Sequence, residues 1–260
     1  GSLGSNTTGT QLTAVGVNAL SNNTTGNYNI ATGHAALSSN TTGQFNCAFG
    51  RVSLNQNTTG NYNNAFGDSA LETNTGNNNS AFGYQALEAN TSAANNTAVG
   101  YQALNDNTTG ANNVAVGSSC LDANTTGGYN NAVGQNALGA NTEGNYNVAI
   151  GQDALANNTT NDNNVAIGRA ALVSNTTGGA NVAIGALCLD ANTTANYNVG
   201  VGSSVLTTNT TGQFNVGLGQ SALFSNTTAS NNTGIGYNAL NQNTTGALNT
   251  AVGSQALAAN

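Results

Sequence analysis

Residues 164–185 read NVAIGRAALVSNTTGGANVAIG and contain one complete repeat and the start of the next. The unit is seventeen residues long and recurs about fifteen times along the 260-residue chain. Its marker is the Gly that ends triplets such as Ala166-Ile167-Gly168. Successive marker glycines are seventeen residues apart, except for sixteen between Gly67 and Gly83. Equivalent positions in successive repeats form what we call a column, and internal repetition of this kind indicates a solenoid.

Two columns do not vary. A Leu follows each marker Gly by four residues, and an Asn follows that Leu by three, while a second Asn, such as Asn147, ends the unit. Stacked amides can form side-chain hydrogen-bond ladders. We therefore predict a structural ladder at Asn23, Asn40, Asn57, Asn107, Asn124, Asn158, Asn175, Asn192, Asn209, Asn226 and Asn243.

A repeat of two short apolar stretches and two turn-like stretches is too short for a pair of helices. It suits one coil of a parallel β-solenoid, or β-roll, in which equivalent residues stack at about 4.7–4.8 Å. The Asn-Thr-Thr-Gly stretch predicts a turn, because Asn and Gly tolerate left-handed backbone. The short coil loses its residue there, at Asn74-Thr75-Gly76. We expect residues 1–260 to form a single array of about fifteen coils, uncapped at both ends, as in a segment of a longer fibre.

The large apolar residue before each marker Gly and the invariant Leu are both expected to point inward. This predicts a core of Val15, Phe49, Phe66, Ile150, Ile167, Ile184, Leu37, Leu104, Leu155, Leu172, Leu206 and Leu240. The preceding residue is always small and should face the other way on a strand. We therefore expect a self-association face, and a homo-oligomer, at Ala48, Ala115, Ala183, Gly200, Gly217 and Gly234.

The amino-acid composition argues against several classes of function. Only 4% of residues are charged, the net charge is −7, and Arg51 and Arg169 are the two cations, so no basic surface for nucleic acid is expected. No apolar run is long enough to insert into a membrane. Three well-separated cysteines do not indicate a disulfide framework.

No set of residues indicates catalysis, a metal site or a cofactor. The single histidine, His34, stands at the variable position after a marker Gly, without a triad around it. Arg51 and Asp68 occupy that position in successive coils and could pair. A column containing Tyr28, Phe45 and Tyr62 could stack or form a carbohydrate-facing stripe, and we favour stacking.

The segments Asn147-Val-Ala-Ile-Gly151, Asn164-Val-Ala-Ile-Gly168 and Asn181-Val-Ala-Ile-Gly185 resemble the repeats of trimeric autotransporter adhesin heads and related phage tail-fibre and bacterial surface-fibre proteins. The resemblance covers nearly the whole chain. It implies a left-handed parallel β-roll and a homotrimer displayed outside the cell. The longer coil departs from that family, and the neck, stalk and anchor modules are absent from this sequence.

The leading functional hypothesis is a structural extracellular fibre or adhesin shaft, on a cell surface or a virion, whose partner is itself. An ice-binding solenoid that uses Thr columns, such as Thr24 and Thr41, is an alternative. A tail-fibre segment that binds a receptor protein or glycan is another. We do not expect an enzyme.

Overall fold

The computed structural model describes residues 1–259 and divides the chain into two compact units, the first from Gly1 to Tyr129 and the second from Asn130 on. Within the described residues there are fifteen strands of three residues each and no helix. Each unit is a stack of coils that contribute one strand apiece. The predicted parallel β-solenoid is therefore confirmed.

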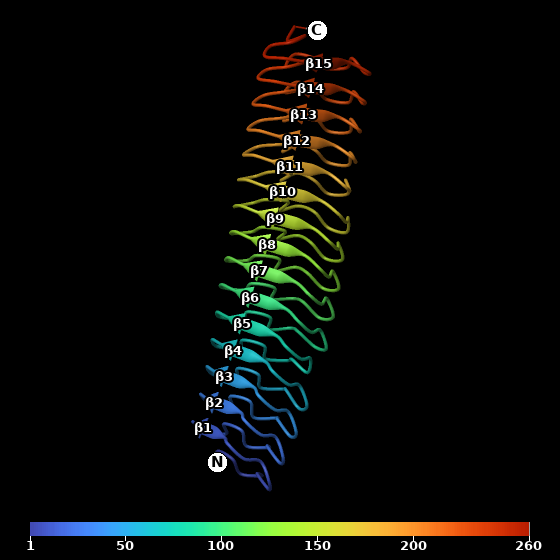
Figure 1. Ribbon diagram of the computed structural model, residues 1–260. Coiled ribbons are helices and arrows are strands. Elements are labelled where there is room, and N and C mark those ends of the chain that lie inside the picture. Colours follow the sequence, from blue (N-terminus) through green and yellow to red (C-terminus); the bar gives the residue numbers. More distant parts are fainter. Residues whose placement is uncertain (260) are drawn as a thin grey trace. The chain divides into compact units, whose positions relative to one another are not determined.

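The first unit holds seven strands that pair in parallel and in chain order (Figure 1, blue to green). Each strand lies in register with the equivalent residues of the next coil, as Ala14 does with Ala31. The strands are β1 (Thr13–Val15), β2 (Ile30–Thr32), β3 (Cys47–Phe49), β4 (Asn64–Phe66), β5 (Ser80–Phe82), β6 (Thr97–Val99) and β7 (Val114–Val116).

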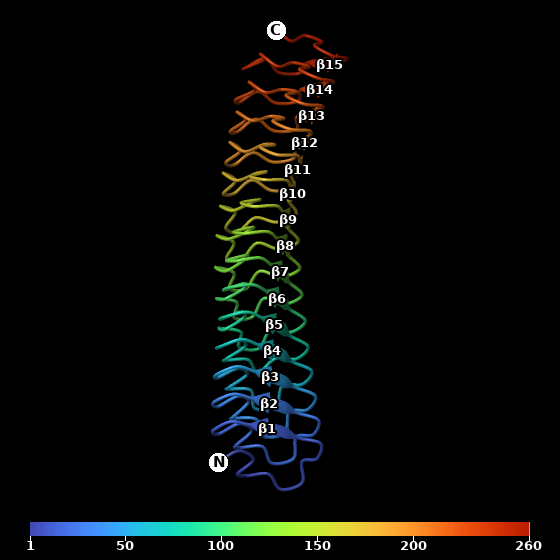
Figure 2. The same ribbon diagram turned by 90° about the vertical axis from the view of Figure 1, so that its left-hand side faces the viewer.

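The second unit repeats this arrangement with eight strands, again parallel and in chain order (Figure 2). The strands are β8 (Asn131–Val133), β9 (Val148–Ile150), β10 (Val165–Ile167), β11 (Val182–Ile184), β12 (Val199–Val201), β13 (Val216–Leu218), β14 (Thr233–Ile235) and β15 (Thr250–Val252). The left-handed coil and the single continuous array stay predictions.

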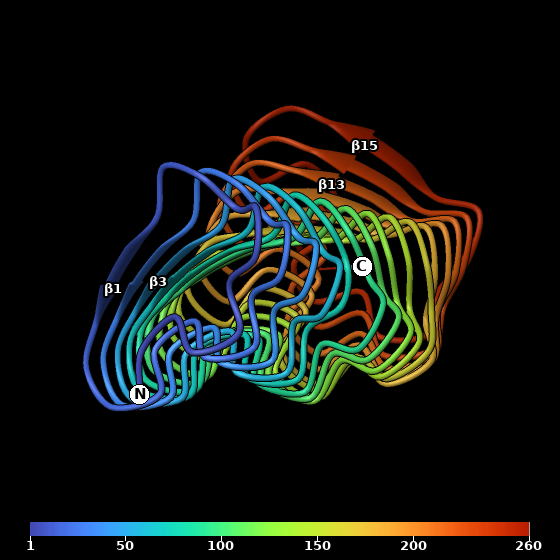
Figure 3. The ribbon, with the colours of Figure 1, turned by 90° about the horizontal axis from the view of Figure 1, so that it is seen from below.

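Backbone bonding between coils extends well beyond the strands. In the first unit the N–H of Leu37 donates to the carbonyl of Ser53 at 2.9 Å, and the N–H of Thr41 donates to that of Thr58 at 2.9 Å. Successive coils of this unit follow nearly the same outline in Figure 3. Stacking therefore satisfies the polar backbone that turns would otherwise leave without partners.

The strands bury the side opposite to the one we expected. Val15 is 57% exposed and Ile150 is 40% exposed, although both were placed in the core. Phe49 and Ile184 are also exposed, and Phe66 and Ile167 are half-buried. The prediction that these six residues form the core is wrong. The invariant Leu side chains are buried as predicted, at Leu37, Leu104, Leu155, Leu172, Leu206 and Leu240.

The small residues at the strand centres fill the core instead. Ala48, Ala115 and Ala183 have no exposed surface, and Gly200, Gly217 and Gly234 are buried as well. The physical reason is space, since a Cβ atom at Gly234 would lie 3.2 Å from the Leu223 side chain. The coil is too thin for a larger inward residue. The self-association face predicted at these six positions is therefore wrong, because they lie inside the protein.

Left-handed backbone also occurs away from the predicted turn. In the described residues, positive φ angles recur in each coil at the invariant Leu, at the residue two before it, and at the aromatic column, as in Leu37 (φ 52°), Ala35 (φ 55°) and Phe45 (φ 57°). The N–H of Ala36 donates to the carbonyl of Gly33, which makes Ala35 the third residue of a turn. A positive φ at that place is typical of type II turns.

The short coil keeps its strand in register, with Ala65 opposite Ala81. The missing residue disturbs the Asn ladder instead, because the buried Oδ1 of Asn57 has no hydrogen-bond partner. The deletion thus falls in the turn, as predicted, and breaks one step of the ladder.

Candidate functional site: buried asparagine ladders beneath an apolar sheet face

The first Asn column forms the predicted ladder. In the first unit, Nδ2 of Asn40 donates to Oδ1 of Asn23 at 2.8 Å and to the carbonyl of Gly43 at 3.1 Å. In the second unit, Asn175 donates in the same way to Asn158, and Asn192 to Asn175. The ladder residues are buried, so each amide links two coils and also closes its own turn.

The second Asn column bonds to the backbone. Nδ2 of Asn46 donates to the carbonyl of Gly60 at 2.7 Å, and Oδ1 of Asn29 accepts the N–H of Asn46 at 2.9 Å. The side chain therefore ties the end of one coil to the turn of the next coil. Sequence reasoning found the column, but its partners depend on the path of the turn.

The Thr columns are divided between the backbone and the solvent. In most of the described turns the first Thr donates its hydroxyl to a carbonyl of the next coil, as Thr24 does to Thr41 at 3.0 Å. The second Thr, such as Thr25, is exposed. The first hydroxyl column is thus mostly bonded to the backbone of the next coil, while its side chains at Thr58, Thr91 and Thr176 are exposed, as those of the second column are.

The large apolar residues of the strands form an outward surface that we call the apolar sheet face. In the first unit it consists of Val15, Thr32, Phe49, Phe66, Phe82, Val99 and Val116. In the second unit it consists of Val133, Ile150, Ile167, Ile184, Val201, Leu218, Ile235 and Val252. Phe49, Phe66 and Phe82 stack with ring centroids 4.9 Å apart at both steps.

This face carries no charge. None of the first or third residues of the fifteen described strands is Asp, Glu, Lys or Arg. Thr32 is the one polar residue in the column of third residues, whereas the first residues on the same side include Asn64, Ser80 and Asn131. Within each unit, an exposed apolar column of this kind marks an interaction site in a protein that is otherwise rich in Asn and Thr.

The aromatic column stacks as we favoured. Tyr28 and Phe45 have ring centroids 4.6 Å apart, and Phe45 and Tyr62 follow at 5.0 Å, with nearly parallel planes. Where the column changes to Asn, an amide ladder continues it, with Asn78 donating to Asn95 at 3.1 Å. Parallel stacking covers the ring faces, and these are the surfaces on which a sugar ring would pack.

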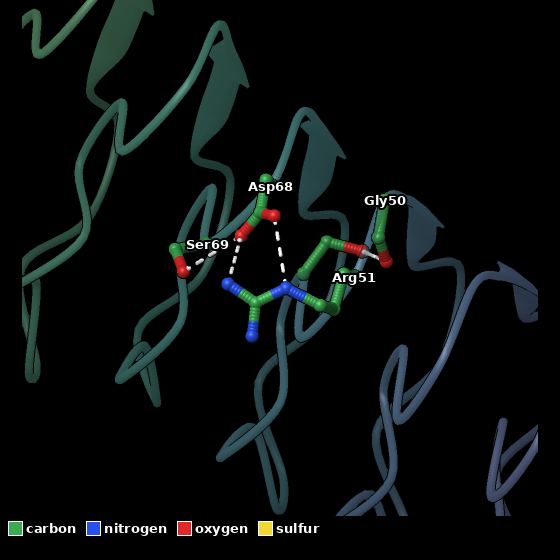
Figure 4. Close-up of polar contacts among 5 residues, drawn as sticks. Gly50, Arg51, Asp68 and Ser69 are labelled. Atoms are coloured by element: carbon green, nitrogen blue, oxygen red, sulfur yellow. Dashed lines mark hydrogen bonds and ion pairs between the residues drawn. The ribbon is translucent and has the colours of Figure 1, made fainter.

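Arg51 and Asp68 form the ion pair that their spacing predicts. Nε and one terminal guanidinium nitrogen of Arg51 donate to the two carboxylate oxygens of Asp68, each at 2.9 Å (Figure 4). The Ser69 hydroxyl also donates to Asp68, at 3.2 Å. Arg51 is exposed and Asp68 is half-buried, so solvent screening leaves the pair little effect on stability. His34 lies one coil away and is exposed.

Burial changes the pKa of two cysteine thiols and of two carboxyl groups. Cys120 and Cys188 replace the small residue before Leu, and burial raises the pKa of each thiol to about 12. Cys47 points outward in β3. Burial also raises the pKa of the Asp122 and Asp190 carboxyls above the usual range. In residues 1–259, no three metal-binding side chains come together, and no helix is long and apolar enough to cross a membrane.

No family model and no curated protein matches the chain. The functional proposal therefore depends on the surface and packing described above.

Proposed function

We propose that this chain is a structural module of an extracellular fibre or adhesin shaft, in which copies of the chain associate through the apolar sheet face. The role is mechanical and not catalytic. The single observation that carries the proposal is the column of large apolar residues that points outward from almost every strand. The resemblance to surface-fibre repeats supports the extracellular setting.

Leaving this many apolar side chains exposed to water is unfavourable in free energy. Burying one Val, Ile or Phe side chain fully is worth roughly 1.5–3 kcal/mol. The eight apolar members in the second unit are Val, Ile and Leu only. Most of these side chains are already more than half buried, as Ile150 is at 40% exposed, so a partner recovers part of this value at each of the eight positions.

A second copy of this chain is the occupant that fits best. Its own face has the same axial repeat, so apolar side chains can interdigitate along many successive coils without losing register. Charge supports the same choice. Each copy carries a net charge of −7, and the uncharged face is where two copies meet with least repulsion.

Sedimentation equilibrium tests the association. We expect the purified chain to be oligomeric, and the double variant Ile150→Thr/Ile184→Thr to shift toward monomer while it keeps its β circular dichroism. Thr is chosen because Thr32 occupies the same column naturally. The control is Val17→Thr, a β-branched apolar residue that is more exposed (64%) and lies outside this column, and this change should leave the oligomer intact. A wild type that stays monomeric at all concentrations would contradict the proposal.

The extracellular setting needs its own test. Antibody against the folded chain should label intact source cells or virions along projecting fibres in immunogold electron microscopy. Labelling that appears only after the cells are permeabilised would place the protein elsewhere.

A further inference from the structure

The column that follows the marker glycines brings two tyrosines into direct contact. Tyr84 and Tyr101 lie in consecutive coils of the first unit, with ring centroids 5.6 Å apart and planes 10° from parallel. They are 46% and 51% exposed. Two phenol rings are therefore held edge-outward beside each other, where solvent and small reagents can reach both.

The surroundings hold this pair in place. The N–H of Gln102 donates to the carbonyl of Tyr84 at 3.0 Å, which fixes the backbone between the two coils. The neighbouring side chains also connect the two coils, because Nε2 of Gln102 donates to Oε1 of Gln85 at 2.9 Å. The rings thus stay adjacent through bonds that do not use their own hydroxyls.

We propose that Tyr84 and Tyr101 are an oxidative cross-linking site, at which a peroxidase with hydrogen peroxide joins the two rings into a dityrosine. Each phenol loses one electron and one proton and becomes a phenoxyl radical. The two radicals combine through a bond between ring carbons ortho to the oxygens. The two ortho hydrogens then move to the oxygens and restore both phenols. Overall, two tyrosines and one hydrogen peroxide give one dityrosine and two waters.

Proximity is what favours coupling within this pair. A phenoxyl radical held against a second tyrosine has a partner without diffusion, which is the advantage of an intramolecular step. The stack of Tyr28, Phe45 and Tyr62 has similar geometry, but Phe separates its tyrosines. Tyr197 also stacks on a Phe, Phe214, at 5.1 Å. These stacks are internal controls, because phenylalanine has no phenol to oxidise.

The product would be a covalent staple between two coils. It joins residues seventeen apart and so resists the separation of those coils under load. This inference needs only one chain, so it stands independently of the proposed self-association.

Oxidation followed by peptide mapping tests the site. The dilute, folded protein is treated with horseradish peroxidase and hydrogen peroxide, denatured, and cleaved after glutamate. Cleavage at Glu88 separates fragment 73–88, which contains Tyr84, from fragment 89–143, which contains Tyr101 and Tyr129. We expect these fragments to remain joined in a species that lacks two hydrogens, with tandem mass spectrometry assigning the bond to Tyr84 and Tyr101.

Two substitutions sharpen the test. Tyr84→Phe should abolish this joined species while keeping the fold, since Tyr–Phe stacks already occur elsewhere in the chain. Phe214→Tyr should create a new cross-link to Tyr197. Both can be made with Cys47→Ser, which removes the outward thiol as a competing radical sink and matches Ser80 in the same column.

Three results would overturn the assignment. The first is oxidised wild type in which fragments 73–88 and 89–143 separate cleanly. The second is equal coupling in urea, which would show that the fold does not direct the reaction. The third is coupling of Tyr197 in the Phe214→Tyr variant without coupling of Tyr84, because the same geometry would then act at one stack and fail at the other.

Discussion

The sulfur of Cys188 occupies the space that a side chain at residue 200 would need, since a Cβ atom on Gly200 would lie 2.5 Å from it. Val205 stands in the same relation to Gly217 in the next coil. In both cases the usual small residue before Leu has become larger, and the usual strand Ala has become Gly. In these two coils, the smaller strand residue makes room for the larger residue before Leu.

Gly200→Ala should therefore destabilise the protein by about 1–3 kcal/mol through overpacking. The double variant Gly200→Ala/Cys188→Ala should recover most of that loss, because it restores the Ala–Ala arrangement of other coils. Urea denaturation of the four proteins in the cycle measures the coupling. Simple additivity of the two single changes would show that the residues do not compete for space.

Asn175→Ala should cost at least about 2 kcal/mol of stability. It removes the acceptor of the Asn192 amide at 2.9 Å and the donor to Asn158 at 3.1 Å, and these partners stay buried. Asn157→Ala is the matched control, since Asn157 is an exposed Asn one residue before a ladder position. It should change the urea midpoint very little. Equal effects at both sites would mean that the ladder is not a main source of stability.

Asp190→Asn should stabilise the protein at neutral pH by about 1 kcal/mol. The Oδ1 of Asp190 is buried without a partner. Asn in this column donates to the carbonyl twenty residues earlier, as Asn105 does to Gln85 at 3.0 Å. The equivalent carbonyl for residue 190 belongs to Ala170, and a carboxylate cannot donate to it.

The same group makes stability depend on pH. The pKa of Asp190 is higher in the folded chain than in the unfolded chain, so the folded state holds the proton more tightly. The Asp190 contribution to the unfolding free energy is therefore largest below the unfolded pKa, and it is lost as pH rises through the folded pKa. The advantage of Asp190→Asn should shrink as pH falls from 7 to about 4. Glu143→Gln controls for net charge, and a constant advantage at every pH would contradict this explanation.

Val52→Asn should stabilise the protein by up to about 1 kcal/mol. Val52 has a φ of 49°, a conformation that β-branched residues rarely adopt. Asn occupies the same column at Asn18, Asn136 and Asn238, also with positive φ. His34→Asn, at a position without positive φ, should give no such gain in thermal melting. A lower melting temperature for Val52→Asn would show that packing of Val52 outweighs its strain.

The sequence predicted the structure correctly at positions where only one residue type can fill the structural role. Leu37 and Asn40 belong to columns that do not vary, because a buried Leu and a doubly bonded amide have no substitutes in the coil. Their burial and the solenoid itself followed from the repeat. The Arg51–Asp68 pair followed from the same register, because both residues share one column.

The orientation of the strand was the error, and its cause is instructive. Phe49 is more apolar than Ala48, so hydrophobicity alone places Phe49 inside. The variety of residues in each column was the better indicator of burial. The Ala48 column contains only Ala and Gly, whereas the Phe49 column contains Val, Ile, Phe, Leu and even Thr. Positive φ at Leu37 had no such signal, because Leu has little preference for that conformation and the neighbouring coils impose it.

The buried ladder has a consequence for how the protein can be made. Most ladder turns, such as Asn158-Thr159-Thr160, are also acceptor sequences for N-linked glycosylation. Nδ2 of Asn158 donates hydrogen bonds to Oδ1 of Asn141 and to the carbonyl of Asn161, both at 3.0 Å. A sugar attached to that nitrogen before folding would occupy a place with no room and remove a donor from the stack. The fold is thus compatible only with a biosynthetic route that leaves these asparagines unmodified, and production in a eukaryotic secretory pathway should yield glycosylated chains unable to close their coils.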